Sequence, residues 1–126
     1  MSYRILVTGS RTWQNVEAVR VAIDLAGRTS RHPPQGVTVV HGGADGADTI
    51  ADVLAHRFGC QVEKHPASEH ESPKTRNLHM VGLGADVCLA FAERWASRAG
   101  HCARAARRAG IRTIDMGVST RIEDRP

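Results

Sequence analysis

Short apolar segments alternate along the chain with segments in which apolar residues recur every three or four positions. A strand that is apolar throughout is covered on both faces, which is typical of a parallel sheet. Parallel strands need long crossover connections, and the segments with helical spacing supply them. The pattern predicts strands over 4–8, 37–40, 60–64, 86–91 and 111–115, and helices over 16–26, 47–58, 75–83 and 97–109.

This alternation predicts a fold class. Right-handed crossovers distribute the helices over both faces of the sheet. We therefore expect an α/β fold, a Rossmann-like doubly wound three-layer sandwich with a five-stranded parallel sheet in the order 3-2-1-4-5. Asn15 is expected to cap the first helix, and Gly59 to end the second. The proline-containing stretch 27–36 predicts a loop.

Length and composition indicate one domain without a membrane segment. The chain has 126 residues, 41% hydrophobic and 24% charged, which is close to the average of globular proteins. We expect a domain over residues 1–116 and a loose tail over 117–126. No apolar run approaches the ~18 residues of a membrane span, so no membrane partner is expected. Three cysteines without a CxxC pair favour a reducing, cytoplasmic location.

The segment after the first predicted strand reads Gly9-Ser10-Arg11-Thr12-Trp13. Glycine permits close approach of the backbone to a ligand, and arginine can bind phosphate through two hydrogen bonds. The segment matches neither G-x-G-x-x-G nor a Walker loop, so a structural turn is as good an interpretation as a phosphate loop. For Trp13 a place in the core is favoured over stacking on a base.

The segment after the second predicted strand, residues 41–48, reads HGGADGAD. Glycines directly before a helix N-terminus predict an anion cradle of exposed backbone N–H groups. Carboxylates repel phosphate, so the two aspartates suit ribose hydroxyls better, or they cap the helix. The candidate binding residues here are Gly42, Gly43, Asp45, Gly46 and Asp48.

Further candidates follow the third and fourth strands. Arg76 and Asn77 begin a predicted helix whose N-terminus points to the same sheet edge, where arginine can neutralise phosphate and asparagine can read a base or sugar. A surface arginine with a capping asparagine is the alternative. Ser97 and Arg98 could close over a ligand from the far side.

Neither a metal ion nor another cofactor is expected. His65, His70 and His79 lie near two glutamates but lack the short fixed spacings of a metal site. No Ser/His/Asp or Cys/His pair at a diagnostic spacing indicates covalent catalysis. Residues 94–114 carry six arginines and no acid, a pattern typical of contact with phosphate or nucleic acid and equally of a solvated helix face.

The motifs ILVTGSRTW (5–13), VVHGGADGADTIAD (39–52), P-x-x-R-N (73–77) and GADVCLAF (84–91) with HCARAARRAGI (101–111) carry a family resemblance. Over roughly residues 3–114 the chain resembles the YspA-like branch of the SLOG superfamily, which unites Smf/DprA and LOG proteins on a Rossmannoid fold. The resemblance implies binding of a nucleotide or nucleotide-derived ligand. Members of the branch are regarded as ligand sensors or processing enzymes in nucleotide signalling and conflict systems.

The resemblance also implies which residues contact the ligand. Residues 9–11 look like the first ligand loop of the family, and Arg76 with Asn77 look like the third. The second loop is similar at Gly42, Gly43, Gly46 and Asp48.

The chain departs from the family after the fourth strand. Relatives often carry a P-G-G-x-G-T or S-x-G-T turn there, and LOG phosphoribohydrolases place a glutamate three residues after its threonine. Here residues 92–101 read AERWASRAGH, and no acid occurs between Arg94 and Ile114. A hydrolase of LOG type is therefore not expected.

The sequence thus predicts a protein that binds a nucleotide-derived small molecule at the carboxyl edge of the sheet, as a sensor or sequestering protein. One alternative is a LOG-like nucleoside monophosphate phosphoribohydrolase in which Asp45 or Asp48 replaces the missing glutamate. Another is DprA-like binding of nucleic acid through the basic C-terminal helix, which is less favoured because the chain has only two lysines. A homo-oligomer formed through an uncovered helix face also remains open.

Overall fold

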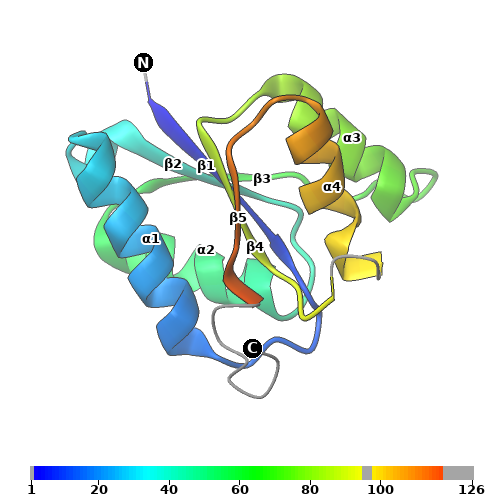
Figure 1. The fold of residues 1–126 in the computed structure, drawn as a ribbon, viewed down its shortest axis with the longest axis horizontal. Coiled ribbons are helices and arrows are strands. Elements are labelled where there is room, and N and C mark those ends of the chain that lie inside the picture. Colours follow the sequence, from blue (N-terminus) through cyan, green and yellow to red (C-terminus); the bar gives the residue numbers. More distant parts are fainter. Residues whose placement is uncertain (1, 95–97, 118–126) are drawn as a thin grey trace, which may run out of the picture.

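A five-stranded parallel sheet forms the centre of the computed structural model, which describes residues 2–94 and 98–117 (Figure 1). The predicted α/β, Rossmann-like fold is confirmed. The strands are β1 (Tyr3–Gly9), β2 (Val37–His41), β3 (Gln61–Lys64), β4 (Val87–Phe91) and β5 (Thr113–Asp115). The helices are α1 (Val16–Ser30), α2 (Ala47–Phe58), α3 (Pro73–Leu83) and α4 (His101–Arg108), with short 3-10 turns at Pro34–Gly36 and Arg98–Gly100.

The strand order is β3-β2-β1-β4-β5, and every neighbouring pair is parallel, as predicted. The chain runs from β1 outward to β2 and β3, then returns to lay β4 on the other side of β1. The direction of winding therefore reverses between β1 and β4. In open α/β sheets this switch point, at the carboxyl ends of the strands, is where ligands bind.

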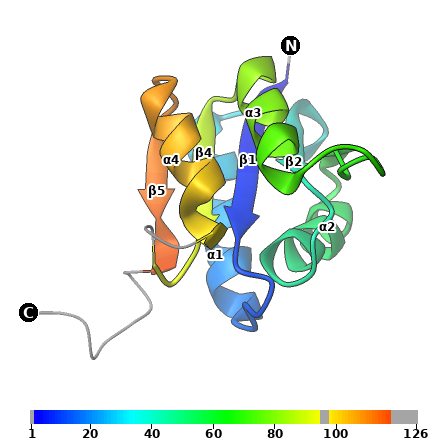
Figure 2. The same ribbon diagram turned by 90° about the vertical axis from the view of Figure 1, so that its right-hand side faces the viewer.

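Helices cover both faces of the sheet (Figures 1 and 2). The cores on the two faces draw on alternate residues of the same strands, because side chains of a strand alternate between its faces. In β1, Ile5 and Val7 pack in the core that α1 and α2 complete. Leu6, between them, packs in the core that α3 and α4 complete. The predicted three-layer sandwich is thus built on the apolar centre of β1, residues Ile5 to Val7.

Helix α1 is longer than predicted. It begins after Asn15, whose side chain accepts from the N–H of Ala18 as expected, but it continues through Gly27 to Ser30. Glycine inside a helix costs only about 1 kcal/mol relative to alanine, so one glycine does not end a helix that packs well. The helix ends at Arg31, which adopts a left-handed conformation with φ 62°.

Other element boundaries also differ from prediction. Strand β5 begins at Thr113, two residues later than expected. Helix α3 begins two residues early, at Pro73, because the Ser72 side chain caps it by accepting from the N–H of Thr75. The last helix is shorter than 97–109, since Arg98–Gly100 forms a 3-10 turn and α4 starts at His101. Gly59 ends α2 as expected. Of the expected tail, only Gly117 is among the described residues.

Within residues 2–94 and 98–117, no helix combines the length and the apolar character that a membrane span requires.

The edge strand β3 is tied to β1 by an ion pair that reaches across β2. The Arg4 guanidinium donates to both carboxylate oxygens of Glu63 at 2.9 and 2.8 Å, and His65 Nε2 lies 2.8 Å from Glu63 Oε2. The contacts with Arg4, and then with His65, lower the pKa of Glu63 to about 2.

Acid is therefore expected to weaken the fold through Glu63. Its pKa is depressed in the folded state, so its contribution is present above the ordinary value of 4.5 and is lost as the pH falls toward about 2. The carboxylate is partly exposed, and solvent screening holds the contribution to about 1 kcal/mol. Urea unfolding at pH 6 and pH 2.5 should show wild type losing more stability than Glu63→Gln. Equal losses in the two proteins would contradict this.

Candidate ligand-binding site

A cavity of about 450 Å³ lies at the carboxyl end of β1, beside the switch point of the sheet. Its wall is formed by the end of β1 and the loop that follows it, by the loop after β2 with the first turn of α2, by α3 with the residue before it, and by the 3-10 turn that leads into α4. The lining residues are Thr8, Gly9, Arg11, Ala44, Asp48, Ser72, Pro73, Lys74, Arg76, Asn77, Met80, Arg98, Ala99 and His101.

The loop after β1 is a structural turn with one side chain directed to the cavity. The Ser10 carbonyl accepts from the N–H groups of Trp13 and Ala47, and Ser10 Oγ lies 2.8 Å from Thr12 Oγ1. Ser10 therefore holds the turn together and does not line the cavity. Arg11 does line it. Trp13 is only 7% exposed and packs edge to face on Phe91 with ring centroids 5.5 Å apart, which confirms its place in the core.

The two loops fit together at Gly46. A Cβ there would overlap the Ser10 carbonyl oxygen and lie 2.6 Å from the Arg11 carbonyl carbon. The Gly46 backbone has φ 75° and ψ −125°, a conformation that only glycine adopts readily. Glycine at this position is thus required for packing between the loops.

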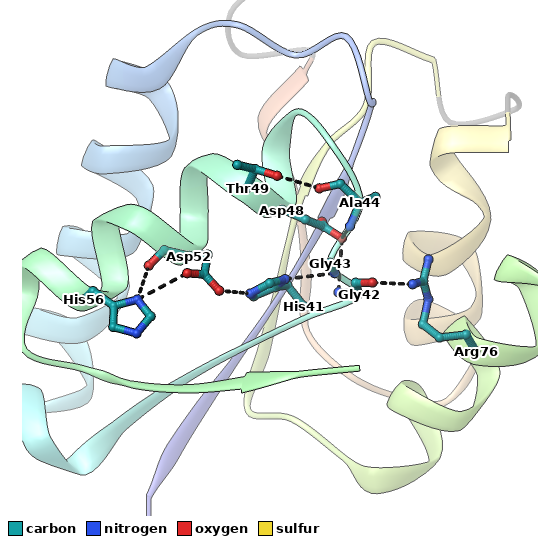
Figure 3. Close-up of polar contacts among 9 residues, drawn as sticks. All are labelled: His41, Gly42, Gly43, Ala44, Asp48, Thr49, Asp52, His56 and Arg76. Atoms are coloured by element: carbon teal, nitrogen blue, oxygen red, sulfur yellow. Dashed lines mark hydrogen bonds and ion pairs between the residues drawn. The ribbon is translucent and has the colours of Figure 1, made fainter. Parts of the chain in front are cut away.

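The loop after β2 differs from the anion cradle expected of it. Asp48 Oδ2 accepts from the N–H groups of Gly42 at 3.1 Å and Ala44 at 3.2 Å (Figure 3). The N–H of Gly43 donates to His41 Nδ1 at 3.0 Å. The expectation that these amides are exposed is wrong, because the loop's own carboxylate and imidazole accept from them. These three N–H groups are therefore not free to bind an anion.

Asp48 is a buried carboxylate at the edge of the cavity. Asp48 is only 6% exposed. Burial raises the pKa of its carboxyl group, although the two backbone hydrogen bonds act in the opposite direction. The N-cap residue of α2 is Gly46, without a side-chain hydrogen bond, so the capping role expected of Asp45 or Asp48 is wrong. Asp48 instead folds back onto the glycine loop.

Arg76 reaches from α3 to the same loop (Figure 3). Its Nη1 donates to the carbonyl oxygens of Gly42 and His65, and its Nε donates to Asn77 Oδ1 at 2.9 Å. The residue is 9% exposed and lines the cavity. A Cβ on Gly42 would overlap this guanidinium, so glycine at 42 makes room for Arg76. Asn77 Nδ2 in turn lies 3.3 Å from His101 Nδ1.

The charge of the cavity wall is positive. Asp48 is the acid among its lining residues. Burial, together with nearby Lys74 and Arg104, lowers the pKa of His101, which favours its neutral imidazole. The cationic lining residues are Arg11, Lys74, Arg76 and Arg98. A concave site with this balance attracts anions.

The sequence-predicted residues divide into groups. One group lines the cavity and consists of Gly9, Arg11, Asp48, Arg76, Asn77 and Arg98. Gly42 and Gly43 do not line the cavity, but they belong to the loop that contacts Asp48 and Arg76. Ser10 holds together the turn after β1. Asp45 and Gly46 line a neighbouring hollow of about 350 Å³, which also borders Arg11. Ser97 lies outside the described residues.

Several lining residues were not predicted, among them Ser72, Lys74 and His101. The Ser72-Pro73 pair is a recognisable helix start and could have placed the first turn of α3 at this edge. His101 carries no comparable signal. In the described part of the chain no group of three or more His, Cys, Asp or Glu side chains lies close enough to hold a metal ion.

The sequence matches the YspA, cpYpsA-related SLOG family over residues 3–71, a span that contains both glycine loops. The chain belongs to this family. This SLOG protein is similar to the Gene 61 protein of Mycobacterium phage D29. The two sequences are 44% identical over 123 residues, which cover 90% of this chain and 96% of the phage protein. Membership of the family suggests either binding of a nucleotide-related ligand or DNA processing.

The fold of this SLOG protein is also similar to the crystal structure of DNA processing protein A (DprA) from Streptococcus pneumoniae, with a TM-score of 0.67 and 18% sequence identity. The similarity covers 89% of this chain but only 49% of DprA, so the chain spans about half of that protein's length. At this identity the likeness concerns the fold alone.

Proposed function

We propose that this protein binds a nucleotide or nucleotide-derived small molecule in the cavity at the carboxyl edge of the sheet, as a sensor or sequestering protein. The observation that carries the proposal is the cavity itself, in which three arginines and a lysine stand against one carboxylate. Its volume of about 450 Å³ lies within the range of roughly 300–1,000 Å³ usual for small-molecule sites.

The arrangement of charges supports one orientation of the ligand. The phosphate would lie toward Lys74, Arg76 and the first turn of α3, where the helix dipole adds to the attraction. It would not lie on the glycine loop, because Asp48 already occupies the N–H groups of Gly42 and Ala44. A sugar would then face Asp48, a good acceptor for ribose hydroxyls.

Binding without hydrolysis is the better supported form of the proposal. Cleavage of a ribosyl bond builds positive charge on the sugar, which a carboxylate must stabilise and nearby cations oppose. Among the lining residues Asp48 alone supplies a carboxylate, and four cationic side chains share the same cavity wall. Burial raises the pKa of Cys102 to about 11, so its thiol is a poor nucleophile at neutral pH.

The proposal is tested by thermal denaturation with a ligand panel. The panel contains nucleosides, their mono- and diphosphates, pyrophosphate and a single-stranded DNA oligonucleotide. A ligand at 100 times its Kd adds about 2.7 kcal/mol, which raises the Tm measurably. We expect stabilisation by at least one phosphorylated compound and none by the matched nucleoside. Stabilisation by the oligonucleotide alone would favour nucleic-acid binding, and no shift with any compound would overturn the proposal.

A further inference from the structure

One peptide unit beside the cavity is held from both ends. Its N–H belongs to Gly43 and donates to His41 Nδ1 at 3.0 Å, while its carbonyl belongs to Gly42 and accepts from Arg76 Nη1 (Figure 3). In a planar trans peptide the N–H and C=O point in opposite directions. His41 and Arg76 therefore contact the same rigid plane from opposite sides.

This peptide would otherwise be free to turn over. Both flanking residues are glycines, which lack the Cβ that restricts backbone rotation, and Gly43 has φ 74°. A flip of the plane would carry the Gly42 carbonyl away from Arg76 and replace it with an N–H donor facing the guanidinium. The hydrogen bond from Gly43 to His41 opposes that flip, so His41 determines which peptide atom Arg76 meets.

His41 can accept this bond only in one tautomer, and Asp52 selects it. His41 Nε2 lies 2.7 Å from Asp52 Oδ2, and a carboxylate only accepts, so Nε2 carries the proton and Nδ1 presents its lone pair. The imidazole is 1% exposed at the end of β2. Asp52 is itself held on α2, where its Oδ1 lies 3.2 Å from His56 Nδ1. His41 does not line the cavity, so its influence on a ligand is indirect.

We propose that His41 is a positioning residue, which holds the Arg76 guanidinium at the cavity wall by locking the Gly42–Gly43 peptide. The proposal rests on the proposed function, in which Arg76 contacts the phosphate of the ligand. Asp52 acts one step further back, by keeping the proton of His41 on Nε2. The contacts form a line from α2 through the end of β2 and the glycine loop to α3.

Two substitutions distinguish the contact made by Nδ1 of His41 from the contact made by its Nε2. An asparagine side chain places its amide oxygen near the position of Nδ1 and can accept from Gly43, whereas a glutamine side chain reaches the position of Nε2 and can donate to Asp52. The probe is pyrophosphate, which presents to Arg76 the same kind of phosphate charge as a nucleotide would. The Kd of pyrophosphate is measured by isothermal titration calorimetry. Thermal denaturation of each variant is recorded alongside.

We expect H41N to bind pyrophosphate within about threefold of wild type despite losing its contact with Asp52. We expect H41Q to bind at least tenfold more weakly even where its Tm equals or exceeds that of H41N. Tenfold corresponds to about 1.4 kcal/mol, in the range of one hydrogen bond. A loss of affinity that follows the Tm of the two variants would show a merely structural role and overturn the proposal.

The tautomer supplies a test that needs no variant. Nitrogen-15 chemical shifts of the imidazole should show a neutral ring with its proton on Nε2 in the wild-type protein. A proton on Nδ1 would overturn the positioning role whatever the variants do. Absence of pyrophosphate binding by wild type would instead contradict the proposed phosphate site, so the two failures are distinguishable.

Discussion

Gly46→Ala is expected to destabilise the fold by about 2–6 kcal/mol, a large effect for a single methyl group. The Cβ would overlap the Ser10 carbonyl oxygen, which is held by hydrogen bonds from Trp13 and Ala47 and cannot move aside cheaply. Overpacking of this kind costs about 1–3 kcal/mol. The Gly46 backbone conformation, φ 75° and ψ −125°, adds about 1–3 kcal/mol of strain for alanine.

Equilibrium unfolding in urea measures this effect, and Gly27→Ala is the matched control. Gly27 lies inside α1, and a Cβ there meets nothing within 4 Å. The same methyl group should stabilise the protein at that position by about 0.5–1 kcal/mol, because alanine favours the helix more than glycine does. Similar small changes in both variants would contradict the close packing between the two loops.

Arg76→Ala is expected to weaken binding of a phosphorylated ligand by at least tenfold. Removal of one hydrogen-bonding partner of a charged group costs roughly 1.5–3 kcal/mol, and each 1.4 kcal/mol is a factor of ten in Kd. The substitution also leaves the Gly42 carbonyl without its contact to Nη1. Stability should therefore fall as well, by about 1–3 kcal/mol for a buried acceptor left unpaired.

Calorimetric titration with pyrophosphate and with a stabilising nucleotide measures the change in affinity. Arg57→Ala is the control. It removes the same charge from an exposed position in the last turn of α2, away from the cavity, and should leave the Kd within about twofold. Arg76→Lys keeps the charge but loses the planar fork, so an intermediate Kd is expected. Equal losses in Arg76→Ala and Arg57→Ala would mean that only net charge matters and that Arg76 is not at the site.

The strand order and the layers of this fold could be predicted from the hydrophobic pattern of the sequence. Segments such as 5–7 and 87–91 are apolar throughout, and a sheet covered on both faces buries them completely. Boundaries were less predictable where a local signal competed with packing. Gly27 and the following prolines indicated a loop, yet α1 continues to Ser30, and the first proline, Pro33, follows only after the helix has ended at Arg31.

The general place of the site was predictable, whereas the roles of several residues were not. Glycine-rich loops at the ends of parallel strands indicated the right sheet edge. Nothing in the spacing of Asp48 shows that its carboxylate turns back to the N–H groups of Gly42 and Ala44, because that contact depends on how the loop packs. His41 was expected in the loop after the second strand, yet it ends β2, and its contact with Asp52 joins residues eleven positions apart.

The location of the bound ligand is tested most directly by titrating nitrogen-15-labelled protein with a nucleotide that raises the Tm, while amide resonances are followed. We predict that the amides of Gly9, Arg11 and Ala44 and those in the first turn of α3 shift in a saturable way with one Kd. The amides of Gly27 and Cys60, which border a separate hollow of about 170 Å³ between α1 and the amino end of β2, should stay unchanged. Saturable shifts confined to that second hollow, or none around the cavity, would contradict the proposed binding site.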